Sequence, residues 1–387
     1  MTDEAVEQRK LSLMRDDPEQ QAVAASRSDE AEETGDGDEE MPRMALTRKR
    51  LLLFGLFVLS AVAFLYFVLP KLAGLQDTWD RAKTGEPGWL IAAGGLEIIS
   101  FGGYILLFRT VFVRGYDRID WSASYQITMA SLAATRLFAS AGAGGVVLTA
   151  WALRRSGMGR RLVACRMIAF LVLLYAVFMA SLVIFGLGLR VGIFNGSAPF
   201  AVTVIPAIFG AAVISIALAL AFVPADFERR LDRWAGGSHE SVAKIARALA
   251  TVPASFASGV RTAIKLVREH HWGVLGAIIW WFFDIGTLWA SFHAFGGPGI
   301  PTFPVIVVAY FCGQLGNLLP LPGGIGGVDG GMIGAFIAFG VPGGLAVVAV
   351  LVYRGFSFWI PTIPGIIAYL QLRRTVARWK TEETLVL

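Results

Sequence analysis

Long apolar stretches, separated by short clusters of Arg and Lys, dominate the sequence from residue 51 onward. A stretch of about 20 apolar residues is long enough to cross the roughly 30 Å hydrocarbon core of a bilayer as a helix. The segments 162–189 and 272–295 are apolar on all sides, whereas strands of a membrane barrel alternate between apolar and polar positions. The pattern therefore predicts an all-α polytopic membrane protein.

Six of the apolar stretches are predicted to cross the whole membrane. Because Lys and Arg accumulate in short cytoplasmic loops, the basic residues 48–50 and 373–374 place both chain termini in the cytoplasm. The remaining basic clusters then orient each helix in turn. The predicted spans are 51–69, 88–108, 162–189, 200–223, 272–295 and 341–370.

Two further apolar regions are predicted to be re-entrant helical hairpins, which enter and leave the membrane on the same side. The region 121–151 lies between two basic clusters, and small residues at 139–145 interrupt it. The region 302–340 contains no Lys or Arg and is interrupted by prolines and glycines at 319–327. Irregular backbone at membrane depth is tolerated where protein or a wet cavity surrounds it.

The order of span, span, hairpin, span occurs twice, with every direction reversed the second time. We therefore expect an inverted repeat, with a first half at 51–189 and a second half at 200–370. Such pseudo-symmetry is common in transporters that alternate access between two membrane faces. The expected membrane domain covers 46–372 and includes a cytoplasmic amphipathic loop at 226–271, which carries eight Lys and Arg residues.

Composition separates the N-terminal tail from this domain. The whole chain is 55% hydrophobic and carries a net charge of +5, but residues 1–41 contain 14 acidic and only 4 basic residues. We expect residues 1–45 to be a disordered acidic cytoplasmic tail, because they have few large apolar residues to bury. The first apolar run begins only at residue 51, which excludes a secretory signal peptide. Residues 373–387 are expected to form a cytoplasmic C-terminal tail.

The cysteines and histidines do not suggest a metal site. Cys165 and Cys312 both lie inside apolar segments, where a free cysteine is usually a packing residue. The four histidines, at 239, 270, 271 and 293, have no metal-ligand spacing. We expect neither a metal nor a cofactor, and no nucleic-acid partner.

Ionisable residues inside the apolar regions are the strongest candidates for function. Each costs about 2.5–3.5 kcal/mol to insert at the centre of a membrane helix, so each needs a partner, water or a role. Two interpretations remain open: the charges form pairs that fix helix register, or the arginines grip a phosphate with two parallel hydrogen bonds. The six residues are Glu97, Arg136, Arg166, Asp284, Asp329 and Arg354.

The stretch 314–331 combines prolines, which forbid a continuous helix, with glycines that expose backbone N–H groups. A helix that starts just beyond it would direct the positive end of its dipole at the break, which favours an anion. Alternatively, the glycine spacings 323/327, 326/330 and 330/334 permit close helix packing. The candidate head-group ligands here are Gln314, Asn317, Pro322, Gly323, Gly324, Gly326 and Gly327.

From 51 to 372, the chain resembles the membrane region of lysylphosphatidylglycerol synthases, which also occurs alone in flippase-like membrane proteins. The resemblance rests on 317–331 and on Tyr353-Arg354, which is followed by a proline at 361 in the last helix. The sequence departs from the family pattern at Asp329, where Glu is commoner, and at 141–142, where Pro-Gly is frequent. The resemblance adds Tyr353 to the candidate site.

This resemblance implies that the protein handles a phospholipid or a lipid-linked substrate, by translocating it between leaflets or by binding its head group. The expected location is the cytoplasmic (inner) membrane of a bacterium. Only 17 residues follow Leu370, so we do not expect the soluble aminoacyl-transferase domain of the bifunctional synthases. Two alternatives remain: an intramembrane enzyme with Asp329 or Glu97 as general base, or a scaffold in a lipid or cell-envelope biosynthesis complex. A homodimer or a biosynthetic partner protein is compatible with each of them.

Overall fold

The structure is a computed structural model, and it describes residues 85–386 except 115, 117, 138–142, 223–255, 298, 319–323 and 325. Every regular element in these ranges is a helix, and they contain no strand. The acidic tail and the first predicted span, 51–69, lie outside the described residues.

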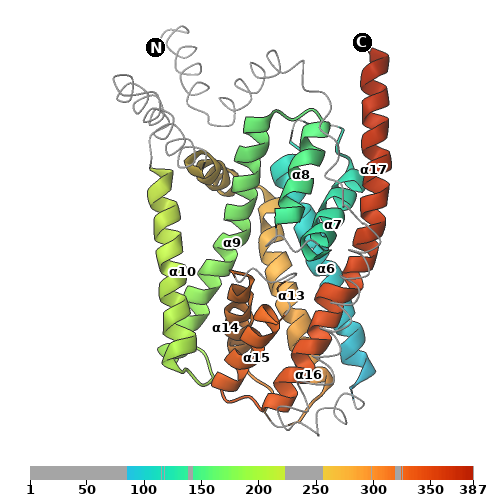
Figure 1. The fold of residues 1–387 in the computed structure, drawn as a ribbon. Coiled ribbons are helices and arrows are strands. Elements are labelled where there is room, and N and C mark those ends of the chain that lie inside the picture. Colours follow the sequence, from blue (N-terminus) through green and yellow to red (C-terminus); the bar gives the residue numbers. More distant parts are fainter. Residues whose placement is uncertain are drawn as a thin grey trace, which may run out of the picture.

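Five helices are long and apolar enough to cross a membrane, and they match five of the six predicted spans. All five run along the long axis of the molecule (Figure 1). The prediction of an integral, multi-pass helical membrane protein is therefore confirmed. The five are α6 (Pro87–Phe112), α9 (Arg160–Arg190), α10 (Phe200–Ala221), η2 with α13 (Trp272–Val274 and Leu275–Ala294), and the continuous helix Gly343–Trp379.

Each region predicted to be a hairpin contains a pair of short helices that pack against each other. The first pair, α7 (Trp121–Leu137) and α8 (Ala143–Arg155), lies in the upper half of Figure 1. The second pair, α14 (Phe303–Gln314) and α15 (Gly327–Ala338), lies in the lower half. A short 3-10 segment, η3 (Leu315–Leu318), extends α14. The breaks predicted at 139–145 and 319–327 thus separate half-length helices.

The last long helix changes its winding in the middle. It consists of α16 (Gly343–Arg354), a π turn at η5 (Gly355–Trp359) and α17 (Ile360–Val386), which continues as helix well past residue 370, the predicted end of the span. Pro361 is the second residue after the π turn and has no N–H to donate to the preceding turn. A π turn inside a helix is rare and frequently marks a functional position.

The core forms around α6 and α13, whose backbones lie in direct contact. A methyl group added at Gly103 would lie 2.8 Å from the amide nitrogen of Trp280, and one added at Gly276 would lie 2.4 Å from the carbonyl oxygen of Gly103. Small residues permit this approach, as in many membrane helix pairs. The two helices therefore form a rigid centre around which the shorter helices are arranged.

The described part of the predicted loop 226–271 includes an amphipathic helix at 256–268, while 226–255 lies outside the described residues. Its buried face consists of Ala257, Val260, Ala263 and Leu266. Gly259 packs against Ile168 of α9. A methyl group added at Gly259 would lie 2.4 Å from the Ile168 side chain.

Candidate functional site

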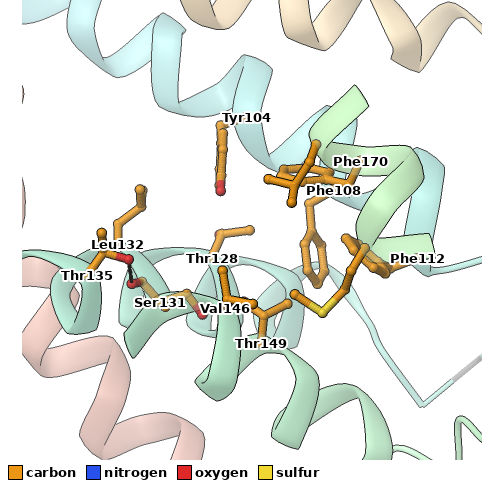
Figure 2. Close-up of a pocket in the computed structure, with 13 residues that line it drawn as sticks. Tyr104, Phe108, Phe112, Thr128, Ser131, Leu132, Thr135, Val146, Thr149 and Phe170 are labelled. Atoms are coloured by element: carbon orange, nitrogen blue, oxygen red, sulfur yellow. Dashed lines mark hydrogen bonds between the residues drawn. The ribbon is translucent and has the colours of Figure 1, made fainter. Parts of the chain in front are cut away.

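A small cavity lies between α6, the α7/α8 pair and α9 (Figure 2). Its volume is about 80 Å³, well below the roughly 300–1,000 Å³ of a typical ligand pocket. Aromatic rings form much of its wall, and five hydroxyl side chains supply polar atoms. One pair of these hydroxyls, Ser131 and Thr149, is hydrogen bonded at 2.8 Å. The five hydroxyls belong to Tyr104, Thr128, Ser131, Thr135 and Thr149.

Arg136, in the last turn of α7, lies directly after the cavity residue Thr135 and reaches across to the π turn. Its Nη2 atom donates to the carbonyl oxygen of Ser357 at 2.8 Å, and Nη1 donates to that of Phe358 at 3.0 Å. In a regular α-helix the amide of residue 361 would bond to the Ser357 carbonyl, but this residue is a proline. Arg136 therefore supplies a donor that the last helix lacks.

Arg354, at the end of α16, forms an ion pair with Asp329 of α15, with 2.5 Å between Nε and Oδ1. The other carboxylate oxygen of Asp329 accepts a hydrogen bond from the amide of Gly326 at 3.0 Å, at the start of α15. The positive end of the α15 dipole, which the sequence suggested for an anionic ligand, is thus occupied by the carboxylate of Asp329.

The two arginines meet on one aromatic ring. The guanidinium carbon of Arg354 lies 4.5 Å from the ring centroid of Phe358, and that of Arg136 lies 5.2 Å from it. Both distances are within the range of cation–π attraction. Two of the six ionisable residues singled out in the sequence thus contact the same aromatic side chain.

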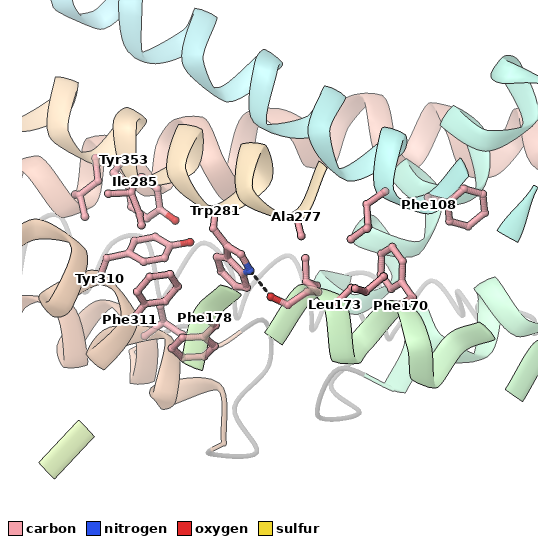
Figure 3. Packing of buried hydrophobic residues seen from close by; sticks show 14 of the residues in the cluster. Phe108, Phe170, Leu173, Phe178, Ala277, Trp281, Ile285, Tyr310, Phe311 and Tyr353 are labelled. Atoms are coloured by element: carbon pink, nitrogen blue, oxygen red, sulfur yellow. Dashed lines mark hydrogen bonds between the residues drawn. The ribbon is translucent and has the colours of Figure 1, made fainter. Parts of the chain in front are cut away.

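Asp284 of α13 is the second anionic centre near these arginines. It is buried, and its Oδ2 atom accepts hydrogen bonds from the hydroxyls of Tyr310 and Tyr353, the latter at 2.9 Å. The surrounding rings belong to the aromatic core, where Trp281 donates to the carbonyl of Leu174 at 2.7 Å (Figure 3). Tyr310 was missed by the sequence analysis, although a tyrosine in an otherwise apolar helix usually needs a partner for its hydroxyl.

Glu97 of α6 lies beside the Asp284 carboxyl group and is only 4% exposed. Neither of its carboxyl oxygens has a hydrogen-bond partner among the described residues. The neighbouring hydroxyl of Thr287 donates to the backbone oxygens of Ala93 and Phe283 instead. Arg136 is close enough for an electrostatic attraction to both acids.

We call these residues the polar cluster. It joins side chains from α6, α7, α13, α14, α15 and α16 at the level of the π turn. Its members are Glu97, Arg136, Asp284, Tyr310, Asp329, Tyr353 and Arg354.

Arg166, which we also predicted to bind a head group, lies outside the polar cluster. Its guanidinium donates to the carbonyl oxygens of Phe112 at 2.9 Å and of Arg114 at 3.0 Å, at the C-terminal end of α6. Carbonyls at a helix end lack partners within the helix, so Arg166 satisfies them and stabilises this end.

The stretch 314–331 has a polar surface and a tightly packed interior. Gln314 accepts a hydrogen bond of 2.8 Å from the exposed side chain of Asn317. Gly324 has a φ of +67°, and an added methyl group would lie 2.5 Å from the Asn317 Oδ1 atom, so this position requires glycine. Pro322 and Gly323 lie outside the described residues.

Glycines bring α14 and α15 together, but not with the spacing we expected. A methyl group at Gly316 would lie 2.3 Å from the carbonyl oxygen of Gly327, and one at Gly313 would lie 2.9 Å from the amide of Met332. By contrast, Gly326, Gly330 and Gly334 face open space, with nothing within 4 Å. The prediction that the glycine spacings 326/330 and 330/334 permit close helix packing is therefore wrong. The close approach to α14 involves the other face of α15.

The described residues contain no group of three or more His, Cys, Asp or Glu side chains that could hold a metal ion. The two cysteines contribute to helix contacts. Cys165 Sγ lies 3.4 Å from Ser258 Oγ of the 256–268 helix, and Cys312 Sγ lies 3.7 Å from the Val202 carbonyl of α10. The polar cluster therefore offers guanidinium, hydroxyl and carboxyl groups for non-covalent binding.

Comparison with known proteins agrees with this picture. The family described as the lysylphosphatidylglycerol synthase transmembrane region matches residues 52–365. The chain belongs to this family. The match includes every residue of the polar cluster, and it confirms the family suggested by the sequence motifs.

Two curated relatives are both named UPF0104 membrane protein and come from Methanothermobacter thermautotrophicus. One is 35% identical over 117 residues, or 28% of this chain and 34% of the relative. The other is 34% identical over 114 residues, or 29% of this chain and 32% of the relative. The alignments thus span about a third of each relative's length.

Proposed function

We propose that this protein binds the anionic head group of a lipid at the polar cluster and moves the lipid between the two leaflets. The observation that carries the proposal is that Arg136 and Arg354 both lie over the ring of Phe358, in the π turn of a membrane helix. Arg136 directly follows Thr135, which lines a cavity with hydroxyl side chains. Membership of the lysylphosphatidylglycerol synthase transmembrane-region family is consistent with a lipid-related role.

The chemistry of the arginines favours an anion. Arg136 binds two neutral carbonyl oxygens, and a phosphate would form stronger, charge-assisted hydrogen bonds with the same guanidinium. Arg354 already binds a carboxylate, so an entering head group would share or displace Asp329. The cluster thus offers the head group two cations at a depth where water is scarce.

We propose that the two short helix pairs are re-entrant hairpins related by an inverted repeat, within six spans. In support, the pair α7/α8 and the pair α14/α15 lie in opposite halves of the molecule. Arginines gather at one end of it, including 109, 114, 154, 155, 160, 161 and 373, which is the end we assign to the cytoplasm of a bacterial inner membrane. The connections at the other end, 191–199, 295–302 and 339–342, contain no Lys or Arg.

Transport requires the cavity to widen. At about 80 Å³ it is too small for a phospholipid head group, so the α7/α8 pair would move away from α6 and α9 to admit one. The α7/α8 pair contributes one member, Arg136, to the polar cluster. It can therefore move away from α6 and α9 without unfolding any long helix. Rocking of one bundle against another is the usual mode of alternating access.

The proposal is tested by reconstituting the purified protein in vesicles and following fluorescent lipids with leaflet-selective quenching. We expect head-group transfer that Arg354→Ala abolishes. Arg190→Ala is the matched control, because Arg190 is an exposed arginine outside the polar cluster that donates to the carbonyl of Ala198. Transfer that is unchanged in Arg354→Ala would contradict the assignment of Arg354.

A second candidate function is an intramembrane enzyme with Glu97 as general base, because its buried carboxyl oxygens accept no hydrogen bond from the described residues. Mass spectrometry of the lipids recovered from the same vesicles separates the two functions. A lipid of changed mass would indicate an enzyme. An unchanged mass with an altered leaflet distribution would indicate translocation.

A further inference from the structure

The two acids at the centre of the polar cluster come from helices that cannot easily move apart. Glu97 lies on α6 and Asp284 on α13, and the backbones of these helices are in contact at Gly103 and Gly276. Both side chains are at least 95% buried. The two carboxyl groups are therefore fixed beside each other, within hydrogen-bonding reach.

This arrangement requires a proton. Two ionised carboxylates have no hydrogen to share, and their like charges repel strongly in a medium of low dielectric constant. Asp284 already accepts hydrogen bonds from Tyr310 and Tyr353, which stabilise its ionised form. The Thr287 hydroxyl beside Glu97 is directed at the backbone oxygens of Ala93 and Phe283, so Glu97 lacks two donors of the kind that Asp284 has. The proton therefore belongs on Glu97, from which it is donated to Asp284.

The charges of the whole cluster lead to the same conclusion. The groups around the acid pair are Arg136 from α7, Tyr310 from α14, Asp329 from α15, and Tyr353 and Arg354 from α16. The three acids face two arginines. One proton makes the cluster electrically neutral, and its loss leaves a net negative charge in the membrane.

A metal cation such as sodium fits less well than a proton. Sodium sites in transporters draw on carbonyl oxygens of unwound helices. The helices α6 and α13 are unbroken at Glu97 and Asp284, so their carbonyls are engaged in helical hydrogen bonds. The hydroxyls of Tyr310 and Tyr353 already donate to Asp284, and Thr287 Oγ1, near Glu97, is directed at backbone oxygens.

We propose that Glu97 and Asp284 form a proton-binding site whose occupation is linked to the binding of an anionic head group at Arg136 and Arg354. An anion adds negative charge beside the acid pair and so favours the protonated state. Linkage is reciprocal, so protonation must favour the anion by the same factor. The proton site stands on its own geometry, while the linkage rests on the proposed function.

The proton site is tested by infrared difference spectroscopy of the reconstituted protein without added lipid substrate. We expect a carboxyl signal from a protonated acid at neutral pH, which disappears in Glu97→Gln and is altered in Glu97→Asp. Glu269→Gln is the matched control, because Glu269 is a surface acid paired with Arg114 and His271. A spectrum without that signal, or one that Glu97→Gln leaves unchanged, would overturn the proton site.

The linkage is tested by the binding of phosphatidylglycerol, whose phosphodiester keeps one negative charge from about pH 5 to about pH 9. We expect binding to strengthen about tenfold as the pH falls over this range, and to become independent of pH in Glu97→Gln. Binding that is equally pH-dependent in wild type and Glu97→Gln would refute the linkage. Binding that requires sodium at constant pH would replace the proton by a metal ion.

The outcomes separate the two proposals. If vesicles show no lipid transfer but the infrared signal is present, the proposed function fails and the proton site stands. If transfer occurs without the signal, only the proton site fails. Glu97→Asp guards against misfolding of the amide variant, because it keeps an acid at this position.

Discussion

The two short helix pairs place opposite charges at the π turn of the last helix. From α7, the cation Arg136 donates to the carbonyls of Ser357 and Phe358. From α15, the anion Asp329 forms an ion pair with Arg354 just before the π turn. One pair thus compensates for a donor that a proline removed, and the other neutralises a charge that the helix carries.

Both short helix pairs are closely packed at a glycine, because a methyl group at Gly316 would lie 2.3 Å from the Gly327 carbonyl oxygen and one at Gly145 would lie 2.5 Å from the Ser131 carbonyl oxygen. The pairs differ in that α7/α8 also borders a hydroxyl-lined cavity of about 80 Å³. The difference teaches that a glycine contact can hold a pair together without filling the space around it. In the proposed transport cycle, the α7/α8 side is the side that opens first.

Asp329→Ala should have the largest effect. It removes the carboxylate from a largely buried ion pair and from the amide of Gly326, so we expect a loss of about 3–5 kcal/mol in stability. Thermal unfolding in detergent measures this loss. Asp329→Glu keeps the charge and should lose much less. Equal losses in both variants would show that the charge at 329 contributes little.

Gly316→Ala should have the second-largest effect, a loss of about 1–3 kcal/mol in stability, because the new methyl group would overlap the carbonyl of Gly327. Gly334→Ala is the matched control in the same helix pair. It faces open space and should be neutral or slightly stabilising, because alanine favours helix by up to about 1 kcal/mol over glycine. If both variants unfold at the same temperature, the tight contact between α14 and α15 is refuted.

Arg136→Lys should weaken the contact of the α7/α8 pair with the π turn by about 1–2 kcal/mol and abolish lipid transfer. A single ammonium group cannot reproduce the planar fork that reaches two carbonyls. Arg166→Lys provides the comparison, because Arg166 also binds two carbonyls but lies outside the cluster. It should lose similar stability and retain transfer. Loss of transfer in both variants would remove the distinction between the two arginines.

Glu269→Gln should have the smallest effect and gives a surface reference for the buried acids. The hydrogen bond with His271, aided by Lys265 and Arg114, lowers the pKa of Glu269. A lowered pKa adds stability at pH values above the usual pKa of a glutamate. That stability is lost as the pH falls through the folded-state pKa. We expect Glu269→Gln to lose less than about 1 kcal/mol of unfolding free energy, because Glu269 is exposed. The unfolding temperatures of both proteins should converge as the pH falls through the lowered pKa of Glu269.

The sequence was sufficient to predict the helices because their signal is local. Apolar stretches of sufficient length and the Pro and Gly breaks at 319–327 placed the long helices and located both short pairs. The intramembrane charges also identified most of the polar cluster, since an ionisable residue at such depth needs a partner.

What the sequence could not give depends on contacts between distant residues. Arg166 and Arg354 are each the single arginine within an apolar span, yet one stabilises the end of α6 and the other pairs with Asp329. Nothing in their neighbouring residues separates these roles, although Arg166 lies near the start of its helix. Tyr310 was missed for the same reason, because its partner is far away in sequence on α13.

The π turn sets the register of everything that follows it. A π turn holds one residue more than a regular turn, and each residue of an α-helix advances the chain by about 100°. Deleting one residue within Gly355–Trp359 would therefore restore regular winding and leave the direction of α17 nearly unchanged. Deleting one residue from the regular part of α16 would instead rotate α17 by about that angle. Thr375, which donates to Gln126 of α7 at 2.7 Å, would then face another direction. The wide turn thus keeps the last helix in register with the first helix pair while it holds an extra residue.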